Sequence, residues 1–223
     1  MSKKDGGTHM CEELTYFDNH DTRIKYYELI LQRENLEDLP EYILPEGYRF
    51  VFYKPGDRDK WIEIEKEAKE FDSYEQGLEA WGRYYANKEE ELLDRMVFVE
   101  NEQGEKVATA TAFYDVTGRD KSCAAWLHWV AVKRSHQGKG LSKPLIRYVL
   151  EIMKSLGYTQ AKIPTQTYTW LACKIYLDFG FVPVPQNAVN SRDGWRIIKA
   201  LTDHPTLDKF DTATIDEILN SNA

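Results

Sequence analysis

The most constraining feature of the sequence is one segment in which an apolar run, a glycine-containing loop and an amphipathic stretch follow one another. The run A-A-W-L-H-W-V-A-V, residues 124–132, is almost entirely apolar, which is typical of a strand buried on both faces. Residues 138–156 carry an apolar stripe at helical spacing, and Gly157 is well placed to end a helix there. The segment therefore predicts a buried strand, a loop and a helix in direct succession.

The rest of the chain predicts further strands and helices in a mixed order. Residues 26–31 fit a strand or a short helix, because a short apolar run does not decide between the two. Further strands are expected at 48–53, 97–100, 107–114, 160–164, 181–184 and 195–201, and helices at 57–71, 74–96, 170–179 and 214–219. This order predicts a mixed α/β (α+β) layer fold and not a repeating doubly wound one.

The punctuation L-P-E-Y-I-L-P-E-G-Y, with two prolines and a glycine, marks the entry to the main domain. We expect an N-terminal extension over residues 1–45, one main domain over 46–203 and a C-terminal helical tail over 204–223. No internal repeat of 20–50 residues is visible, and a chain of 223 residues suits one domain of ordinary size or a domain with an N-terminal extension.

The composition excludes several classes of protein. The 37 Asp and Glu residues outnumber the 29 Lys and Arg, a formal net charge of -8, so neither nucleic acid nor an anionic membrane is an expected partner. No apolar run approaches the roughly 18 residues of a membrane helix, and no apolar stretch follows the basic start. The 3 cysteines, which lie far apart without a CxxC pair, argue against a disulfide framework or a zinc site: Cys11, Cys123 and Cys173. We expect a cytoplasmic protein without a metal.

The loop K-R-S-H-Q-G-K-G has the properties of a phosphate-binding site. A helix N-terminus presents unpaired N–H groups and the positive end of the helix dipole, and Gly138 and Gly140 let the backbone approach an anion closely. A Walker A loop is excluded because Lys133 replaces its first glycine, and a dinucleotide motif is excluded because Lys143 replaces its third. The plainer alternative is that the glycines only start a helix. The basic residues around the loop suit a phosphate: Lys133, Arg134, Lys139 and Lys143.

Two sequence signatures give the chain a family resemblance. Q-G-K-G-L-S resembles the Q/R-x-x-G-x-G/A signature of the GNAT acetyltransferase superfamily, with Gln137, Gly140 and Ser142 on its fixed positions. Downstream, T-W-L-A-C-K-I-Y-L-D-F-G-F resembles the second signature, N-x-x-A-x-x-x-Y-x-x-x-G-F, in which the matching residues are Ala172, Tyr176, Gly180 and Phe181. The resemblance covers roughly residues 48–201. It implies the GNAT acyl-CoA N-acyltransferase fold, with a central, mostly antiparallel sheet flanked by helices.

The same resemblance implies that acetyl-CoA, or a related acyl-CoA, is the acyl donor. Its pyrophosphate would lie on the loop amides and its pantetheine arm beside residues 124–132, while Pro164 suits a strand end that leaves its neighbour. Two residues depart from the signatures: Ser142 replaces Gly or Ala, and Thr169 replaces a frequent Asn while remaining a good N-cap. The predicted cofactor-binding residues are Val130, Ala131, Val132, Gln137, Gly138, Lys139, Gly140, Leu141, Ser142, Lys143 and Thr169.

Tyr176 is the predicted acid and His128 the predicted base. A phenol with a pKa of roughly 10 can protonate a thiolate whose thiol has a pKa of roughly 8.5 at a cost of about 2 kcal/mol. His128 lies two residues before Val130, so strand alternation directs both to one side unless a bulge intervenes; a buried core histidine is the equal alternative. Asp115 and the acidic helix 63–70 are alternative bases, although exposed carboxylates are the default. Cys173 is a minor covalent alternative.

The predicted function is transfer of an acetyl group from acetyl-CoA to a primary amine, small molecule or peptide, by direct attack. The acidic balance favours a cationic acceptor, and a homodimer is compatible with the sequence. Two alternatives stay open. One is a GNAT-fold sensor or regulator that binds acyl-CoA without turnover, because fold does not fix function. The other is an unrelated module whose glycines bind a simple nucleotide.

Overall fold

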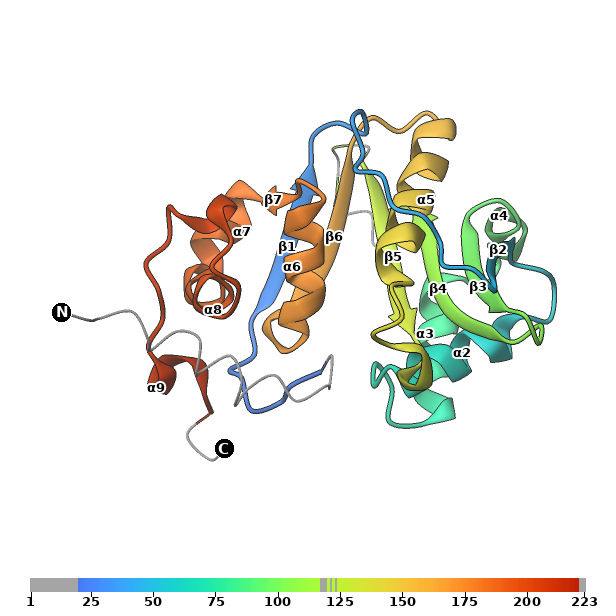
Figure 1. Ribbon diagram of the computed structural model, residues 1–223, viewed down its shortest axis with the longest axis horizontal. Coiled ribbons are helices and arrows are strands. Elements are labelled where there is room, and N and C mark those ends of the chain that lie inside the picture. The colour runs from blue at the N-terminus through green and yellow to red at the C-terminus, as the bar shows by residue number, and fades with distance from the viewer. Residues whose placement is uncertain (1–19, 117–119, 121, 123, 221–223) are drawn as a thin grey trace. The chain divides into compact units, whose positions relative to one another are not determined.

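The computed structural model describes residues 20–116, 120, 122 and 124–220 (Figure 1). It divides into two compact units: a larger unit, Arg33–Ile163, and a smaller unit, Met1–Gln32 with Pro164–Ala223. The described strands form one sheet of seven strands in the order β2-β3-β4-β5-β6-β1-β7. The pairings are antiparallel between β1 and β7 and from β2 to β5, and parallel between β5 and β6. The predicted mixed, mostly antiparallel sheet is thus confirmed.

In the larger unit, four antiparallel strands form a continuous ladder, and Ala125 and Trp126 of the last strand pair in parallel with Ala161 and Lys162 of β6. The strands of the ladder are β2 (Tyr48–Phe52), β3 (Met96–Asn101), β4 (Lys106–Phe113) and β5 (Ala125–Val132), and β6 spans Ala161–Gln166. The strands expected at 97–100 and 107–114 correspond to β3 and β4, which pair as an antiparallel hairpin. Helices pack on both faces of β4 and β5, so the side chains on both faces are buried, and this explains why the two strands are largely apolar.

Helices cover both faces of this ladder (Figure 1). Helix α5 (Ser142–Ser155) packs on β3, β4 and β5, whereas α2 (Arg58–Glu67) packs on β4 and β5 and against α3 (Tyr74–Tyr84). A short helix, α4 (Glu89–Leu92), follows α3. The predicted helix 74–96 is therefore two helices, separated at Asn87, whose positive φ of 64° interrupts the helical path.

Close packing between α2 and α3 depends on a glycine. A Cβ on Gly77 of α3 would lie 2.5 Å from Ile62 Cγ2 of α2, so only glycine fits at this contact. Ser73 caps the start of α3 by accepting a hydrogen bond from the backbone N–H of Gln76 at 3.3 Å. The two helices then enclose, with the sheet, a cluster of large aromatic side chains: Tyr53, Trp61, Phe71, Trp81, Tyr85, Phe98 and Phe113.

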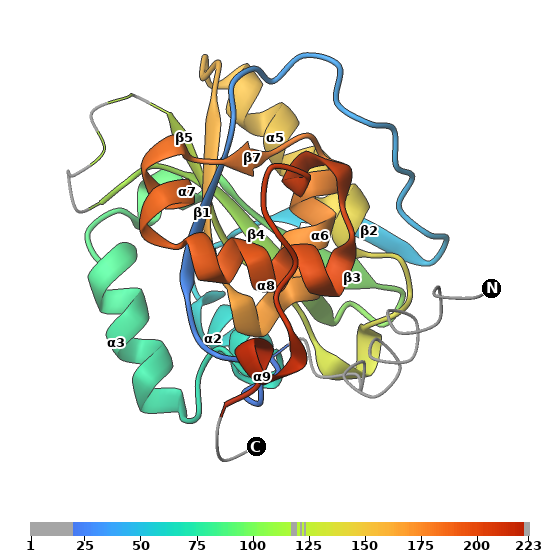
Figure 2. The same ribbon diagram turned by 90° about the vertical axis from the view of Figure 1, so that its left-hand side faces the viewer.

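The smaller unit pairs β1 (Glu28–Arg33) with the short strand β7 (Val182–Pro183), so residues 26–31 contribute to a strand and not to a helix. Its helices are α6 (Trp170–Asp178), α7 (Pro185–Asn190), α8 (Arg192–Thr202) and α9 (Ile215–Ile218). Helix α8 packs on α6 and α7 and lies against β1 (Figure 2): a Cβ on Gly194 would lie 3.0 Å from Leu29 Cδ2 of β1 and 2.7 Å from Cβ of Tyr27, the residue before β1.

The expected strand at 195–201 is wrong, because these residues belong to α8. The buried residues of this segment recur at helical intervals, with Trp195, Ile198 and Leu201 on one side and the polar Arg196 and Lys199 between them. A short segment with five apolar residues among seven also fits a strand, which is why the pattern alone favoured the wrong element.

The predicted domain limits fall differently from the compact units. Residues 33–45 of the predicted extension belong to the larger unit. The extension also contains β1 (Glu28–Arg33), which is a strand of the sheet. The predicted tail contains the short turn Pro205–Leu207 and α9. Residues 1–19 and 221–223 of the predicted extension and tail lie outside the described residues.

Candidate active site

The loop between β5 and α5 has the backbone conformation that an anion site needs. Gly138 and Gly140 have φ values of 74° and 78°, a left-handed region that is costly for residues with a Cβ. Leu141, the N-cap of α5, makes no side-chain capping bond, so no side chain at that position covers the first amides of the helix. Gln137 Nε2 donates to Val132 O at 3.1 Å and fixes the start of the loop against the end of β5.

The predicted residues of β5, of the loop and of the start of α5 follow one another along the chain in the larger unit, and Arg134–His136 form a short 3-10 helix in the loop. Lys133 N donates to Val107 O of β4 at 2.8 Å. Because successive amides along a strand point to opposite edges, the amide of Val132 points away from β4. That backbone group is thus directed to the other edge of β5, as an extended ligand along that edge requires.

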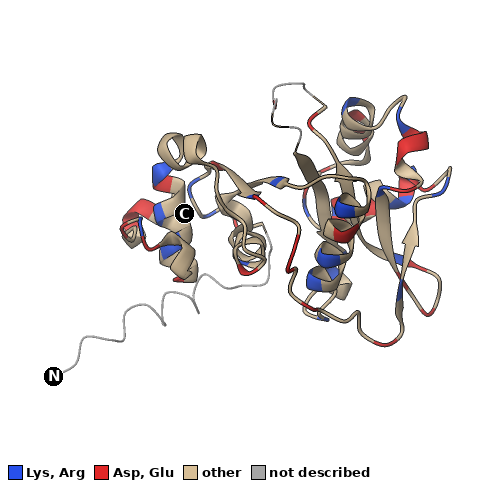
Figure 3. Cartoon of the chain, turned by 90° about the horizontal axis from the view of Figure 1, so that it is seen from above, with Lys and Arg blue, Asp and Glu red and all other residues tan. Residues whose placement is uncertain are grey.

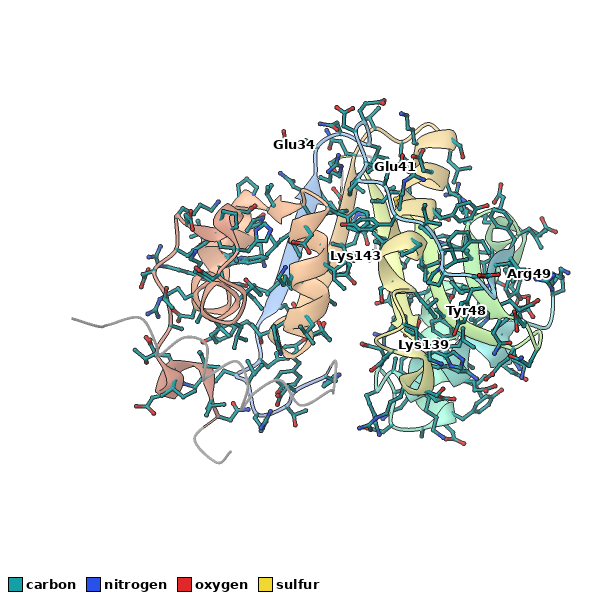
Figure 4. All side chains as sticks on the ribbon, viewed as in Figure 1. Glu34, Glu41, Tyr48, Arg49, Lys139 and Lys143 are labelled. Atoms are coloured by element: carbon teal, nitrogen blue, oxygen red, sulfur yellow. The ribbon has the colours of Figure 1, made fainter. Side chains whose placement is uncertain are left out.

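Aromatic and basic side chains surround the loop (Figure 4). Lys143 Nζ lies 5.1 Å from the centre of the Tyr42 ring, and the rings of Tyr48 and His136 are 6.2 Å apart. Arg147 of α5 pairs with Glu41 at 2.7 Å, so residues near 41 run beside this helix. The predicted N-terminal extension thus contributes to the surroundings of the loop, which the sequence signatures did not indicate.

Lys133 has a structural role and is not available to a phosphate. The residue is 2% exposed, and its Nζ pairs with Glu63, with Glu67 at 3.5 Å and with Glu105 at 2.9 Å. Burial alone lowers the pKa of Lys133, but Glu63 and Glu105 raise it overall, so the ammonium keeps its charge. The cation ties α2 to the β3–β4 hairpin. Elsewhere on the helices of both units, acidic and basic residues are interspersed (Figure 3).

A bulge interrupts β5 where the expected alternation would have placed His128 beside Val130. Thr111 pairs with His128 but Thr109 pairs with Ala131, so the intervening part of β5 holds one extra residue. Trp129 takes a φ of 52°, a conformation that is rare for a bulky side chain. Since directly paired residues share a face, His128 lies on the Ala131 face, where α2 and α3 pack, and the expected alternation with Val130 is wrong.

His128 is a buried, neutral histidine among aromatic rings. It is 6% exposed, and its ring lies 5.5 Å from that of Tyr84 and 5.8 Å from that of Phe113. Burial lowers the pKa of His128 to about 4, with a smaller opposing effect of Asp115. Its Nδ1 has no hydrogen-bond partner among the residues that the structure describes. The imidazole is therefore unprotonated at neutral pH and is a weak base.

One carboxylate of the acidic helix 63–70 departs from the expected exposure. Glu65 is fully buried, and neither of its carboxyl oxygens has a hydrogen-bond partner among the described residues. The signal was present in the sequence, because Glu65 stands in the same helical stripe as Trp61, Ile64 and Ala68. The default that surface carboxylates are solvated is wrong at this position.

Three further candidates, Tyr176, Thr169 and Cys173, belong to the smaller unit. Tyr176 of α6 is 5% exposed, and its ring lies 6.4 Å from that of Phe181. Thr169 is the N-cap residue of α6, but its hydroxyl donates to Gln166 O at 3.1 Å and makes no capping bond. Burial raises the pKa of the Cys173 thiol, which keeps that sulfur protonated and poorly nucleophilic.

The sequence profile described as the acetyltransferase (GNAT) family matches residues 58–181, which is more than half of the chain and includes the loop and both signatures. The chain belongs to the GNAT acetyltransferase family. The predicted family is thereby confirmed, and acyl transfer is the chemistry of that family.

Curated relatives agree with this assignment over short stretches. N-acetyltransferase 8F1 of Rattus norvegicus is 32% identical over 69 residues, 31% of this chain and 30% of that protein. N-acetyltransferase 8B of the same organism is 38% identical over 55 residues, 25% of each protein. The matches thus span less than a third of each relative.

Solved structures confirm the GNAT fold. A GCN5-related N-acetyltransferase from Sphaerobacter thermophilus has a TM-score of 0.56 at 16% identity, over 82% of this chain and 54% of that one. A GNAT-family acetyltransferase from Colwellia psychrerythraea has a TM-score of 0.54 at 17% identity, over 74% of this chain and 56% of that one. At these identities the likeness concerns the fold alone.

Two other classes of feature are absent from the described part of the chain. No group of three or more His, Cys, Asp or Glu side chains within the described residues is arranged to hold a metal ion. Two of the cysteines weighed for such a site, Cys11 and Cys123, lie outside the described residues. No described helix has both the length and the apolar character that crossing a membrane requires.

Proposed function

We propose that this GNAT family member transfers an acetyl group from acetyl-CoA to a primary amine of a small molecule or peptide, by direct attack of the amine on the thioester. The observation that carries the proposal is the loop 137–141, whose two left-handed glycines lead into the N-terminus of α5 within the family signature. Amides at a helix start favour a diphosphate, which is the charged part of the donor.

In the proposed complex, the pyrophosphate binds backbone N–H groups of residues 137–143, and Lys139 and Lys143 contribute positive charge. The pantetheine arm lies along the free edge of β5, with hydrogen bonds to the backbone of Val130 and Val132. Thr169 stays a candidate contact through its place at the start of α6. The two glycines support close approach of the phosphates because neither carries a Cβ.

Chemistry then requires an acid for the leaving thiolate and an acceptor for a proton of the amine. We assign the first role to Tyr176, on the strength of its place in the second signature. An alkylammonium with a pKa of about 10.4 needs about 4.6 kcal/mol to be neutral at pH 7, so loss of its proton is the more demanding step. His128 is the candidate acceptor on β5, but its low pKa makes it a weak one.

The proposal is tested by measuring release of free thiol from acetyl-CoA over a panel of amines that includes polyamines, aminoglycosides, amino acids and short peptides. Turnover with at least one amine is expected. Tyr176→Phe should lower kcat by roughly 100-fold or more while the dissociation constant for acetyl-CoA stays unchanged. Binding of acetyl-CoA without turnover on any amine would instead indicate a sensor.

A thermal-shift comparison of acetyl-CoA with ATP tests the donor. A ligand present at 100 times its dissociation constant should stabilise the fold by about 2.7 kcal/mol. Stabilisation by ATP but not by acetyl-CoA would contradict the proposed donor and favour a simple nucleotide ligand. CoA without the acetyl group is the matched control, since it shares the pyrophosphate and lacks the thioester.

A further inference from the structure

A segment of the larger unit, residues 37–46, runs beside α5 just before the chain enters β2. Two of its carboxylates pair with cations of that helix. Glu37 pairs with Lys154, near the end of α5. Glu41 pairs with Arg147, in the first half of α5, at 2.7 Å (Figure 4). The contacts of this segment, which we call the flanking segment, therefore move towards the start of α5 as the chain advances.

The flanking segment continues past the start of α5 and reaches the phosphate-binding loop. The Nζ of Lys143, in the first turn of α5, lies over the ring of Tyr42, 5.1 Å from its centre. Further on, Pro45 Cγ would lie 3.8 Å from a Cβ on Gly140, so the segment lies next to the loop itself. The flanking segment thus forms one side of the loop at the end where α5 begins.

Contacts at both ends hold the flanking segment in place. Leu36, the residue before it, is buried, and the guanidinium of Arg33 donates to the backbone oxygen of Glu37 at 2.6 Å. At the other end, Tyr48 begins β2, which pairs with β3 along its whole length. Because both ends are fixed, the ring of Tyr42 has a defined place beside the first turn of α5.

A ring beneath an ammonium directs the cation without cancelling its charge. The negative face of a tyrosine ring attracts an ammonium that lies within about 6 Å of the ring centre. The contact between Tyr42 and Lys143 meets this condition. It therefore orients the ammonium of Lys143 at the end of the loop and adds no negative charge there. The carboxylates of Glu37 and Glu41 engage cations that lie further along α5.

A CoA donor extends from the loop in two directions. Under the proposed function the diphosphate lies on the loop amides, with the pantetheine arm on one phosphate and the adenosine on the other. The arm lies along β5, which joins the start of the loop, where Gln137 Nε2 donates to Val132 O at 3.1 Å. The adenosine is then left at the other end of the loop, beside Lys143 and the flanking segment. Its ribose carries a further anion, the 3′-phosphate.

We propose that Lys143 binds the ribose 3′-phosphate of the donor and that Tyr42 positions the Lys143 ammonium for this contact. The inference rests on the proposed acyl transfer and deepens it, because it gives the charge of Lys143 a specific target. A phosphate monoester carries about 1.5 to 2 negative charges at pH 7 and offers three acceptor oxygens to an ammonium. Tyr42 acts through Lys143 and does not touch the donor, so it is a positioning residue.

Calorimetric titration of the full chain with CoA and with dephospho-CoA, which lacks only the 3′-phosphate, tests the assignment. The wild type should bind CoA about 10-fold more tightly than dephospho-CoA, as expected for one charge-assisted hydrogen bond. Lys143→Gln should lose most of this factor for CoA, with a much smaller loss for dephospho-CoA. In turnover, the same variant should raise the KM for acetyl-CoA by about the same 10-fold and leave kcat unchanged.

Two substitutions of Tyr42 separate positioning from packing. Tyr42→Leu removes the ring and should weaken CoA binding by about 3-fold, as expected for an exposed cation–π contact, with dephospho-CoA less affected. Tyr42→Phe keeps the face of the ring and should bind CoA as the wild type does. Ile43→Ala is the matched control, because the side chain of Ile43 is 90% exposed on the same segment. It should leave both affinities unchanged.

Lys139→Gln supplies a contrasting result, because Lys139 lies between the two loop glycines. It should weaken CoA and dephospho-CoA by similar factors, since both ligands carry the diphosphate. Equal losses of the two ligands in Lys143→Gln, or equal affinities in the wild type, would overturn the assignment of the 3′-phosphate. Wild-type affinity in Tyr42→Leu would overturn the positioning role. A folded wild type that binds neither CoA nor acetyl-CoA would overturn the proposed donor itself.

Discussion

At the scale of single residues, the loop depends on two backbone conformations that glycine adopts more cheaply than any other residue. Gly140 has a φ of 78°, and a Cβ added there would lie 3.8 Å from Pro45 Cγ, an ordinary contact, so strain and not crowding opposes a side chain. Gly138, at 74°, has no described atom within 4 Å of an added Cβ. Both glycines therefore preserve the loop path that presents its amides to a phosphate.

Gly140→Ala should strain the backbone by roughly 1–2 kcal/mol and weaken acetyl-CoA binding by up to about 10-fold. Isothermal titration with acetyl-CoA and thermal unfolding measure the two effects. Gly82→Ala is the control: it lies in α3 with open space for an added Cβ, so the substitution should leave affinity unchanged and stabilise the helix by up to about 1 kcal/mol. Equal affinities in all three proteins would contradict the role of the loop.

At the scale of elements, α2 and α3 form a closely packed pair in front of the aromatic cluster. Gly77→Ala would bring a Cβ to 2.5 Å from Ile62 Cγ2, so the helices must separate, and overpacking of this kind costs about 1–3 kcal/mol. Ile62→Ala removes the obstructing carbon but leaves a cavity. The double variant should therefore be more stable than the sum of the single effects predicts, by about 1 kcal/mol, in a denaturation cycle. Additive effects would show that the contact carries no strain.

Elements also show what sequence alone can predict. The β5–loop–α5 segment was predictable because its helical stripe is long and its loop bears a signature. Helix α8 was missed because the spacing of apolar residues in 195–201 fits a strand as well as a helix. The bulge at Trp129 could not be predicted from the sequence, because it is defined by how the residues of β5 pair with those of β4, and the sequence does not show this pairing. Burial of Glu65 was visible in the stripe of α2, but its lack of a partner depends on α3 and β4.

At the scale of the whole molecule, two carboxyl groups give the stability opposite dependences on pH. The pKa of Asp120 is lowered: burial opposes ionisation, but Ser122, Lys162 and Trp126 outweigh it through hydrogen bonds, of which that from Trp126 Nε1 is 2.7 Å long. The stability that Asp120 contributes is therefore present above the pKa of the unfolded chain, about 3.9, and is lost as pH falls below it. Glu65, whose pKa is raised, contributes in the reverse sense.

In the unfolded chain Glu65 ionises near pH 4.3, whereas in the folded chain its raised pKa delays ionisation to higher pH. The free energy of unfolding therefore falls as pH rises from about 4.3 towards the folded-state pKa. Glu65→Gln removes this loss, so its advantage in unfolding free energy over the wild type should grow from about pH 4 towards neutrality. Asp120→Asn should show the opposite trend, with a deficit that is largest near neutrality and vanishes in acid. Urea denaturation of both variants at a series of pH values measures these differences. A constant difference for Glu65→Gln across the series would mean that this carboxyl is already ionised in the folded protein, and that it is hydrated in spite of its place on the buried face of α2.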